Sequence, residues 1–183
     1  MVKYQRNKSI LKRKRKEPPS SKNFAEQFEL VDDVYEILEK SVQSLQGIVS
    51  DCSGEYHSLC QYISESITYF NSAMGYAEDF FEVSWDNVEY NDIPGFGDFE
   101  PFVASVSKAV FPYTDIIDGD VAQIVRRCKE VFKDLNKACE SIREYYYNQR
   151  FFDDSHQNYA GLIMYEIEDG LQLLSKAVCT IIQ

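Results

Sequence analysis

The chain has 183 residues, 44% of them apolar and 14% aromatic, which is enough for one domain with a packed core. Its five cysteines contain no C-x-x-C pair, and no window approaches the roughly 18 consecutive apolar residues of a membrane span. Residues 1–22 hold nine bases and one acid, whereas the remaining 161 residues hold 10 bases and 29 acids. No nucleic-acid binding is expected of so acidic a body, and any contact with a polyanion must come from the tail or a local patch.

The first 23 residues predict a disordered basic tail, followed by a helical body over residues 24–183. The tail is rich in charge and poor in apolar residues, and it ends in a Pro-Pro-Ser-Ser hinge. Its basic run has three interpretations that the sequence leaves open: a solubilising tail, a nuclear-import signal, or an electrostatic anchor for an anionic membrane. The run consists of Lys12, Arg13, Lys14, Arg15 and Lys16.

The stretch from Phe24 to about Phe81 carries apolar residues at alternating steps of four and three. This spacing predicts one long helix with a seam for packing or dimerisation, because a 3.5-residue repeat keeps one stripe facing a partner only if helices supercoil. At 1.5 Å per residue the helix would span roughly 85 Å. The clearest seam positions are Val31, Tyr35, Leu38, Val42, Leu45, Val49, Leu59 and Ile63.

Two further helices are expected, from about Phe102 to Asn148 and from about Asp154 to Ile182. A turn over 84–101 precedes the second helix, in which Pro112 and Gly119 predict a kink near residues 108–120. The predicted fold is therefore all-α: an elongated, antiparallel three-helix coiled-coil bundle. Since the first helix is longer than the third, part of its stripe lacks a partner within one chain, which favours a homodimer.

Catalytic chemistry finds little support in the sequence. The two histidines, His57 and His156, are far apart and are expected to lie on exposed or flanking helix positions, and the cysteines fall on apolar stripes. We therefore predict no enzyme activity, no cofactor and no metal site.

The basic concentration in the body lies on the second helix. Several of these residues recur at helical spacing and could line one face as a candidate phosphate-contacting stripe. The alternative is a set of surface ion pairs with Glu130, Asp134, Glu140 and Glu144. The basic residues are Arg126, Arg127, Lys129, Lys133, Lys137 and Arg143.

The predicted architecture resembles a BAR domain, most closely the BAR modules that precede PH and Arf-GTPase-activating domains. The likeness is carried by the segment 116–121, an apolar pair followed by Asp-Gly-Asp, and by Lys129 to Leu135 one turn of helix later. A weaker likeness lies in Phe151-Phe152 and the apolar residues of the third helix. Helix one is similar by periodicity alone.

The resemblance implies a curved homodimer that binds or senses membranes through basic residues. Together with the tail, it predicts a cytoplasmic, membrane-peripheral scaffold for membrane trafficking that is also a platform for protein partners. The alternative is an acidic helical adaptor carried to the nucleus by its basic tail, with no membrane role.

Overall fold

The structure is a computed structural model that describes residues 22–51, 54–83, 108–114, 119–148, 151 and 154–182. The basic tail and the turn predicted over 84–101 lie outside these residues. Four α-helices account for most of the described chain: α2 (Lys22–Asp51), α3 (His57–Glu82), α5 (Asp120–Asn148) and α6 (Asp154–Cys179). The described residues contain no strand, so the prediction of an all-α bundle is confirmed.

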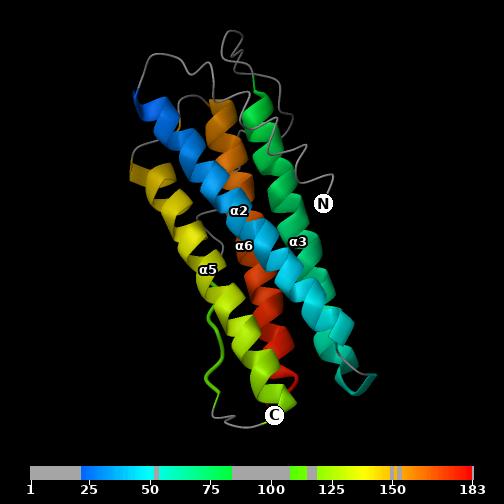
Figure 1. The fold of residues 1–183 in the computed structure, drawn as a ribbon. Helices are drawn as coiled ribbons and strands as arrows, with labels where there is room; N and C mark the ends of the chain where they lie inside the picture. Colours follow the sequence, from blue (N-terminus) through cyan, green and yellow to red (C-terminus); the bar gives the residue numbers. More distant parts are fainter. Residues whose placement is uncertain are drawn as a thin grey trace.

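The predicted single helix from Phe24 to about Phe81 is instead two antiparallel helices. α2 ends at Asp51, a 3₁₀ turn covers Gly54–Tyr56, and α3 runs back along α2 (Figure 1). The seam residues still face the core, because Val31, Leu38 and Leu45 on α2 and Leu59 and Ile63 on α3 are fully buried. The sequence Ser-Asp-Cys-Ser-Gly at 50–54 explains the break, since these residues favour turns over helix interiors.

The predicted second helix is also shorter than expected. Residues 108–114 are not helical, and α5 begins at Asp120, directly after Gly119 with a positive φ of 92°. In place of a kinked helix, 108–114 forms an extended strap. Two large side chains of this strap, Val110 and Tyr113, are 77% and 86% exposed. The third predicted helix matches α6 to within three residues.

The four helices occupy the corners of a square. Contacts join α2 to α3, α3 to α6, α6 to α5 and α5 to α2, and each of these neighbours is antiparallel (Figure 1). Consequently α3 and α5 lie on a diagonal and are parallel, so the chain between them must cross the length of the bundle. Bundles with one such crossover are a known variant of the four-helix architecture.

The core runs through the whole square and leaves the predicted seam no free stripe. Tyr35 donates a hydrogen bond to Glu78 at 3.0 Å between α2 and α3, while Phe28 packs on Phe80 with ring centroids 5.3 Å apart. The apolar stripe that favoured a homodimer is therefore covered within one chain. At 30 residues, α2 is about 45 Å long, roughly half the predicted helix.

A glycine lets α3 pack closely on α6. A Cβ built on Gly170 would stand 2.3 Å from Cε1 of Phe70, whose ring is fully buried. The absence of a side chain at Gly170 thus lets the Phe70 ring lie directly on the backbone of α6. This contact fixes the spacing of α3 and α6.

Candidate functional site

Four basic side chains form an exposed face on α5, which we call the cationic face. Arg126, Lys129, Lys133 and Lys137 are all exposed to solvent. Among the described residues none of the four forms an ion pair, which departs from the surface pairing that the sequence also allowed. These four cations therefore remain available to an anionic partner.

Both like and opposite charges lie at helical spacing along α5. Lys129, Lys133 and Lys137 follow one another at i, i+4, and each contact between like charges costs about 0.2–0.5 kcal/mol. Arg126 and Glu130 are four residues apart, and Glu130 and Lys133 are three apart, so the spacing would also allow ion pairs. None of these pairs forms among the described residues.

The carboxylate of Glu140 is occupied by other partners. Its Oε1 lies 2.8 Å from Nζ of Lys108 and 3.8 Å from Nε of Arg143. The acid that follows Lys137 along the helix thus contacts the strap and the interior instead of the cationic face.

Arg127, predicted in the same basic stripe, has a structural role instead. Its guanidinium lies 3.5 Å from Oδ2 of Asp51 and donates a hydrogen bond at 3.3 Å to the backbone oxygen of Ser44. It crosses beside Gly47, where an added Cβ would stand 2.9 Å from Nη2 of Arg127. Arg127 therefore joins α5 to α2 at the lower part of the bundle.

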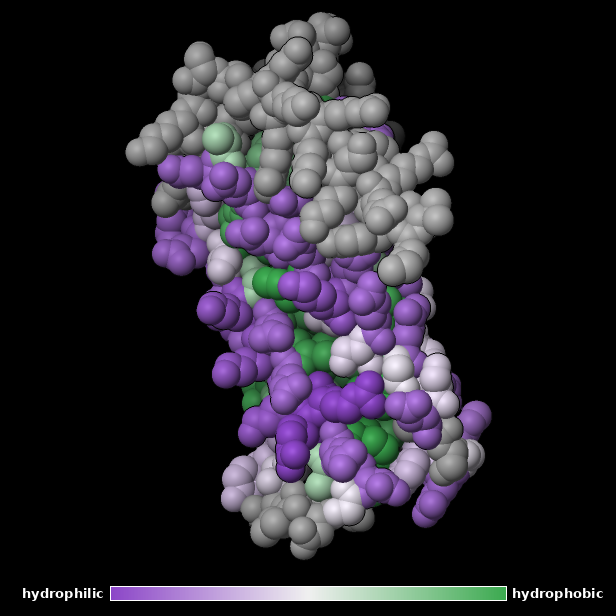
Figure 2. All heavy atoms as spheres, viewed as in Figure 1, coloured by the Kyte–Doolittle hydropathy of each residue, from purple (hydrophilic) through white to green (hydrophobic). Residues whose placement is uncertain are grey.

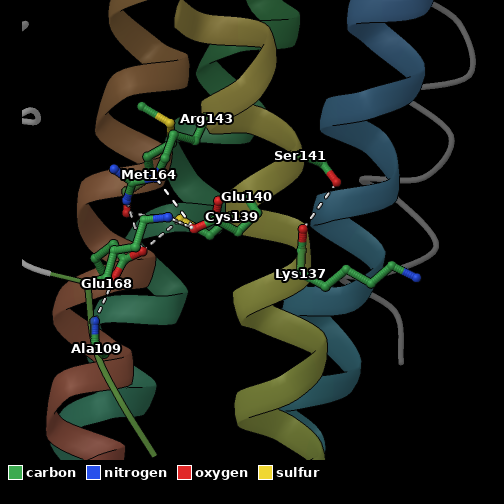
Figure 3. A network of polar contacts seen from close by, with 9 residues as sticks. Ala109, Lys137, Cys139, Glu140, Ser141, Arg143, Met164 and Glu168 are labelled. Atoms are coloured by element: carbon green, nitrogen blue, oxygen red, sulfur yellow. Dashed lines mark hydrogen bonds and ion pairs between the residues drawn. The ribbon is translucent and has the colours of Figure 1, made fainter.

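Arg143 turns inward to a buried carboxylate that the sequence reasoning missed. Nη2 of Arg143 donates to Oε1 of Glu168 at 3.0 Å, and the Glu168 side chain is 1% exposed (Figure 3). The backbone N–H of Ala109 donates to the other carboxylate oxygen at 3.2 Å. Glu168 thereby fastens the strap to the bundle, helped by Ser175, which donates to the carbonyl oxygen of Val110 at 2.7 Å.

The thiol of Cys139 completes this cluster. It lies 3.5 Å from Oε1 of Glu168 and 3.8 Å from the carbonyl oxygen of Met164, so the S–H acts as a donor (Figure 3). Burial and the nearby Glu168 charge raise the pKa of Cys139 far above its usual value. A thiol held protonated in this way is a poor nucleophile, which agrees with a packing role.

A groove of about 580 Å³ separates α2 from α5. Figure 2 shows apolar atoms between hydrophilic borders along this side of the molecule. Lys40 and Lys137 lie on opposite borders, together with Asp33, Glu130 and Asp134. Its apolar residues are Leu30, Val34, Ile37, Val131 and Ala138.

The outer surface of α3 and α6 has the opposite charge. α3 contains no Lys or Arg, and the one base of α6 is Lys176 in its last turn. We call Asp79 and Glu82 of α3, with Glu166 and Asp169 of α6, the acidic face.

Burial disfavours the ionisation of three carboxyl groups of the acidic face, those of Asp79, Glu166 and Asp169. Burial and the neighbouring Asp169 raise the pKa of Glu166 to about 7, and burial and Glu82 raise that of Asp79. Burial and the charges of the face raise the pKa values of Tyr76, next to Glu166 and Asp79, and Tyr159, next to Asp79 and Glu82. These two tyrosines connect the carboxylates of α3 and α6 into one surface.

Neither histidine lies in a metal site within the described residues. His57 is exposed at the start of α3, as expected. The expected exposure of His156 is wrong, because its side chain is fully buried with its ring 4.7 Å from that of Phe80. The candidate tail site Lys12–Lys16 lies outside the described residues.

No protein-family model, curated protein or solved structure matches the chain. Within the described residues, no helix has the length and apolar character needed to span a membrane.

Proposed function

We propose that the chain is a non-enzymatic scaffold that lies on anionic membrane surfaces through the cationic face of α5, with the basic run Lys12–Lys16 as a second contact. The observation that carries this proposal is a set of four exposed cations on one helix of an otherwise acidic body, none of them ion-paired among the described residues. The helix diagonally opposite, α3, contains no Lys or Arg. A bundle with this charge distribution would be oriented by a negative surface, with α5 toward it and α3 away.

The strength of such binding can be estimated from the charges. Each basic residue close to an anionic leaflet contributes about 1 kcal/mol, so the cationic face alone would give binding in roughly the millimolar range. The five basic residues of the tail would bring the total to roughly the micromolar range. Two weak contacts on one chain would therefore make a reversible, peripheral association at the cytoplasmic leaflet.

A narrower version is a BAR-like homodimer that supports curved membranes in traffic and presents a platform to protein partners. Its support is the sequence resemblance alone. The apolar stripe that was expected to pair two chains is buried inside a single chain and does not favour a dimer. Mass determination in solution tests this version. A mass of about twice the 21.2 kDa of one chain would favour the homodimer, and a monomeric mass would leave only the proposal that one bundle docks on the membrane through its charges.

The test of membrane docking is sedimentation with vesicles of phosphatidylcholine containing phosphatidylserine. The face variant is Lys129→Gln, Lys133→Gln and Lys137→Gln. The matched control removes three exposed cations outside α5: Lys40→Gln, Lys108→Gln and Lys176→Gln.

The face variant should bind about a hundredfold more weakly, since three basic residues at about 1 kcal/mol each are lost. The control has the same net charge and should bind within about threefold of the wild type. Equal losses in the two variants, or binding that survives 0.5 M salt, would exclude docking through α5.

A second candidate function is an acidic adaptor that reaches the nucleus through Lys12–Lys16 and binds basic partners. The acidic face of α3 and α6 favours this alternative. A fluorescent reporter carrying residues 1–22 would accumulate in the nucleus if the run is an import signal, and the five-glutamine version of the run would not.

A further inference from the structure

The acidic face lies along a row of regularly spaced aromatic side chains. Tyr62, Tyr69 and Tyr76 follow one another at intervals of seven residues on α3, and each is only partly buried. Tyr159 extends the row onto α6. Tyrosine rings combine apolar area with a polar end and also attract cations over their faces, so this surface suits a basic peptide better than an apolar one.

The charge of this surface is not balanced by its own helices. The single base of α6, Lys176, lies in the last turn, about 10 Å along the helix from Asp169. The raised pKa values of Asp79, Glu166 and Asp169 have burial as their largest cause. A cation brought between these carboxylates would offset their mutual repulsion.

The chain supplies a segment of opposite charge at the correct end of the bundle. α2 begins at Lys22 at the same end at which α3 ends and α6 begins (Figure 1). Five residues lie between Lys16 and Lys22, so the chain from one to the other reaches about 20 Å, whereas packed helices have axes only about 8–10 Å apart. Lys16 can therefore reach the last turn of α3.

The length of the basic run also fits the face. Lys12 to Lys16 spans at most about 14 Å when extended. Glu166 lies beside Tyr76, which is six residues or about 9 Å before Glu82 along α3, and Asp169 lies one helical turn beyond Glu166. The carboxylates thus cover about the same distance as the five basic side chains.

We propose that the run Lys12–Lys16 docks on the acidic face of its own chain. Given the membrane contact assigned to this run under the proposed function, docking holds the tail off the membrane until an anionic surface competes for it. The bundle is then a binding module for a basic peptide, with its own tail as the occupant.

The test measures binding of a fluorescent synthetic peptide, residues 8–17, to the full chain with a neutralised tail. Three receptors are compared, each verified as folded by circular dichroism. The parent carries Lys12→Gln, Arg13→Gln, Lys14→Gln, Arg15→Gln and Lys16→Gln. The face variant adds Asp79→Asn, Glu82→Gln, Glu166→Gln and Asp169→Asn. The matched control instead adds Asp33→Asn, Glu130→Gln, Asp134→Asn and Glu144→Gln, all exposed on α2 and α5.

The peptide should bind the parent and the control within about twofold of each other, and the face variant on the order of tenfold more weakly, because four surface charge contacts are lost. Equal weakening in the control and the face variant, or no binding to the parent at roughly millimolar peptide, would overturn the proposal. No membrane is present in this assay, so its failure is distinct from the failure of membrane docking. If both proposals hold, the four face substitutions in the chain with its native tail strengthen vesicle binding.

Discussion

Replacing Gly170 with alanine tests whether the close packing of α3 on α6 holds the bundle together. The new Cβ would meet the Phe70 ring at 2.3, 2.8 and 2.8 Å, all below the distances that real Cβ atoms adopt. Phe70 is fully buried, so its ring cannot swing into solvent. Overpacking of this kind costs about 1–3 kcal/mol, while the better helix propensity of alanine returns up to about 1 kcal/mol. The balance of the two effects leads us to expect that Gly170→Ala lowers the free energy of unfolding by about 1 kcal/mol.

Urea unfolding followed by circular dichroism gives the measurement, with Gly75→Ala as the control. Gly75 lies in α3 with nothing within 4 Å of its would-be Cβ, so the control should be as stable as the wild type or up to about 1 kcal/mol more stable. Adding Phe70→Leu to Gly170→Ala should recover part of the loss, because the smaller side chain makes room for the methyl group. A Gly170→Ala protein as stable as the Gly75→Ala protein would refute the close contact.

The pKa of Glu166 is raised to about 7, so its proton binds more tightly to the folded state than to the unfolded one, and the associated stability is present below about pH 4.5 and lost as pH rises through 7. Glu166→Gln should remove this loss, so at pH 8 the variant's free energy of unfolding should exceed that of the wild type by about 1 kcal/mol, a value reduced for the solvent exposure of Glu166. Urea unfolding at pH 5 and pH 8 gives the measurement. A variant whose free energy of unfolding depends on pH as the wild type's does would contradict this expectation. Arg143→Met leaves Glu168 buried without its main partner and should lower the free energy of unfolding by about 3 kcal/mol. Adding Glu168→Leu should restore most of that loss. An Arg143→Met protein as stable as the wild type would show that the ion pair does not stabilise the fold. Tyr113→Ser should leave the thermal midpoint unchanged, because the side chain is 86% exposed, and a marked fall would mean that the strap buries it.

The sequence predicted the helical faces well but missed a reversal of the chain. The heptad pattern continues from Val49 to Leu59 through the turn, because both α2 and α3 direct their stripes at the same core. The apolar periodicity shows which side of a helix is buried. It does not show whether the chain continues as one helix or reverses direction into a second, antiparallel helix. The turn-forming residues at 50–54 were the local indication of this reversal. They decide between one continuous helix and two antiparallel helices, because the apolar spacing fits both.

Prediction of the site was limited by contacts between distant segments. Spacing alone placed six basic residues on α5, but Arg127 and Arg143 leave that set because Asp51 and Glu168 lie on neighbouring helices. Glu168 itself could have been suspected, since it stands beside Ile167 on a helix that is apolar around most of its circumference. Its hydrogen bond to the strap depends on a non-helical segment 59 residues earlier in the chain, which helical periodicity cannot reveal.

The crossover between the diagonal helices has a consequence for the order of folding. α2 with α3, and α5 with α6, are hairpins of neighbouring segments, whereas the contact of Phe70 with Gly170 joins residues 100 positions apart. Closing a loop of that length costs about 4 kcal/mol in chain entropy, far more than either hairpin requires. We expect the two hairpins to form early and to meet late along α3 and α6. Substitutions in that final seam would then mainly accelerate unfolding and leave the refolding rate almost unchanged.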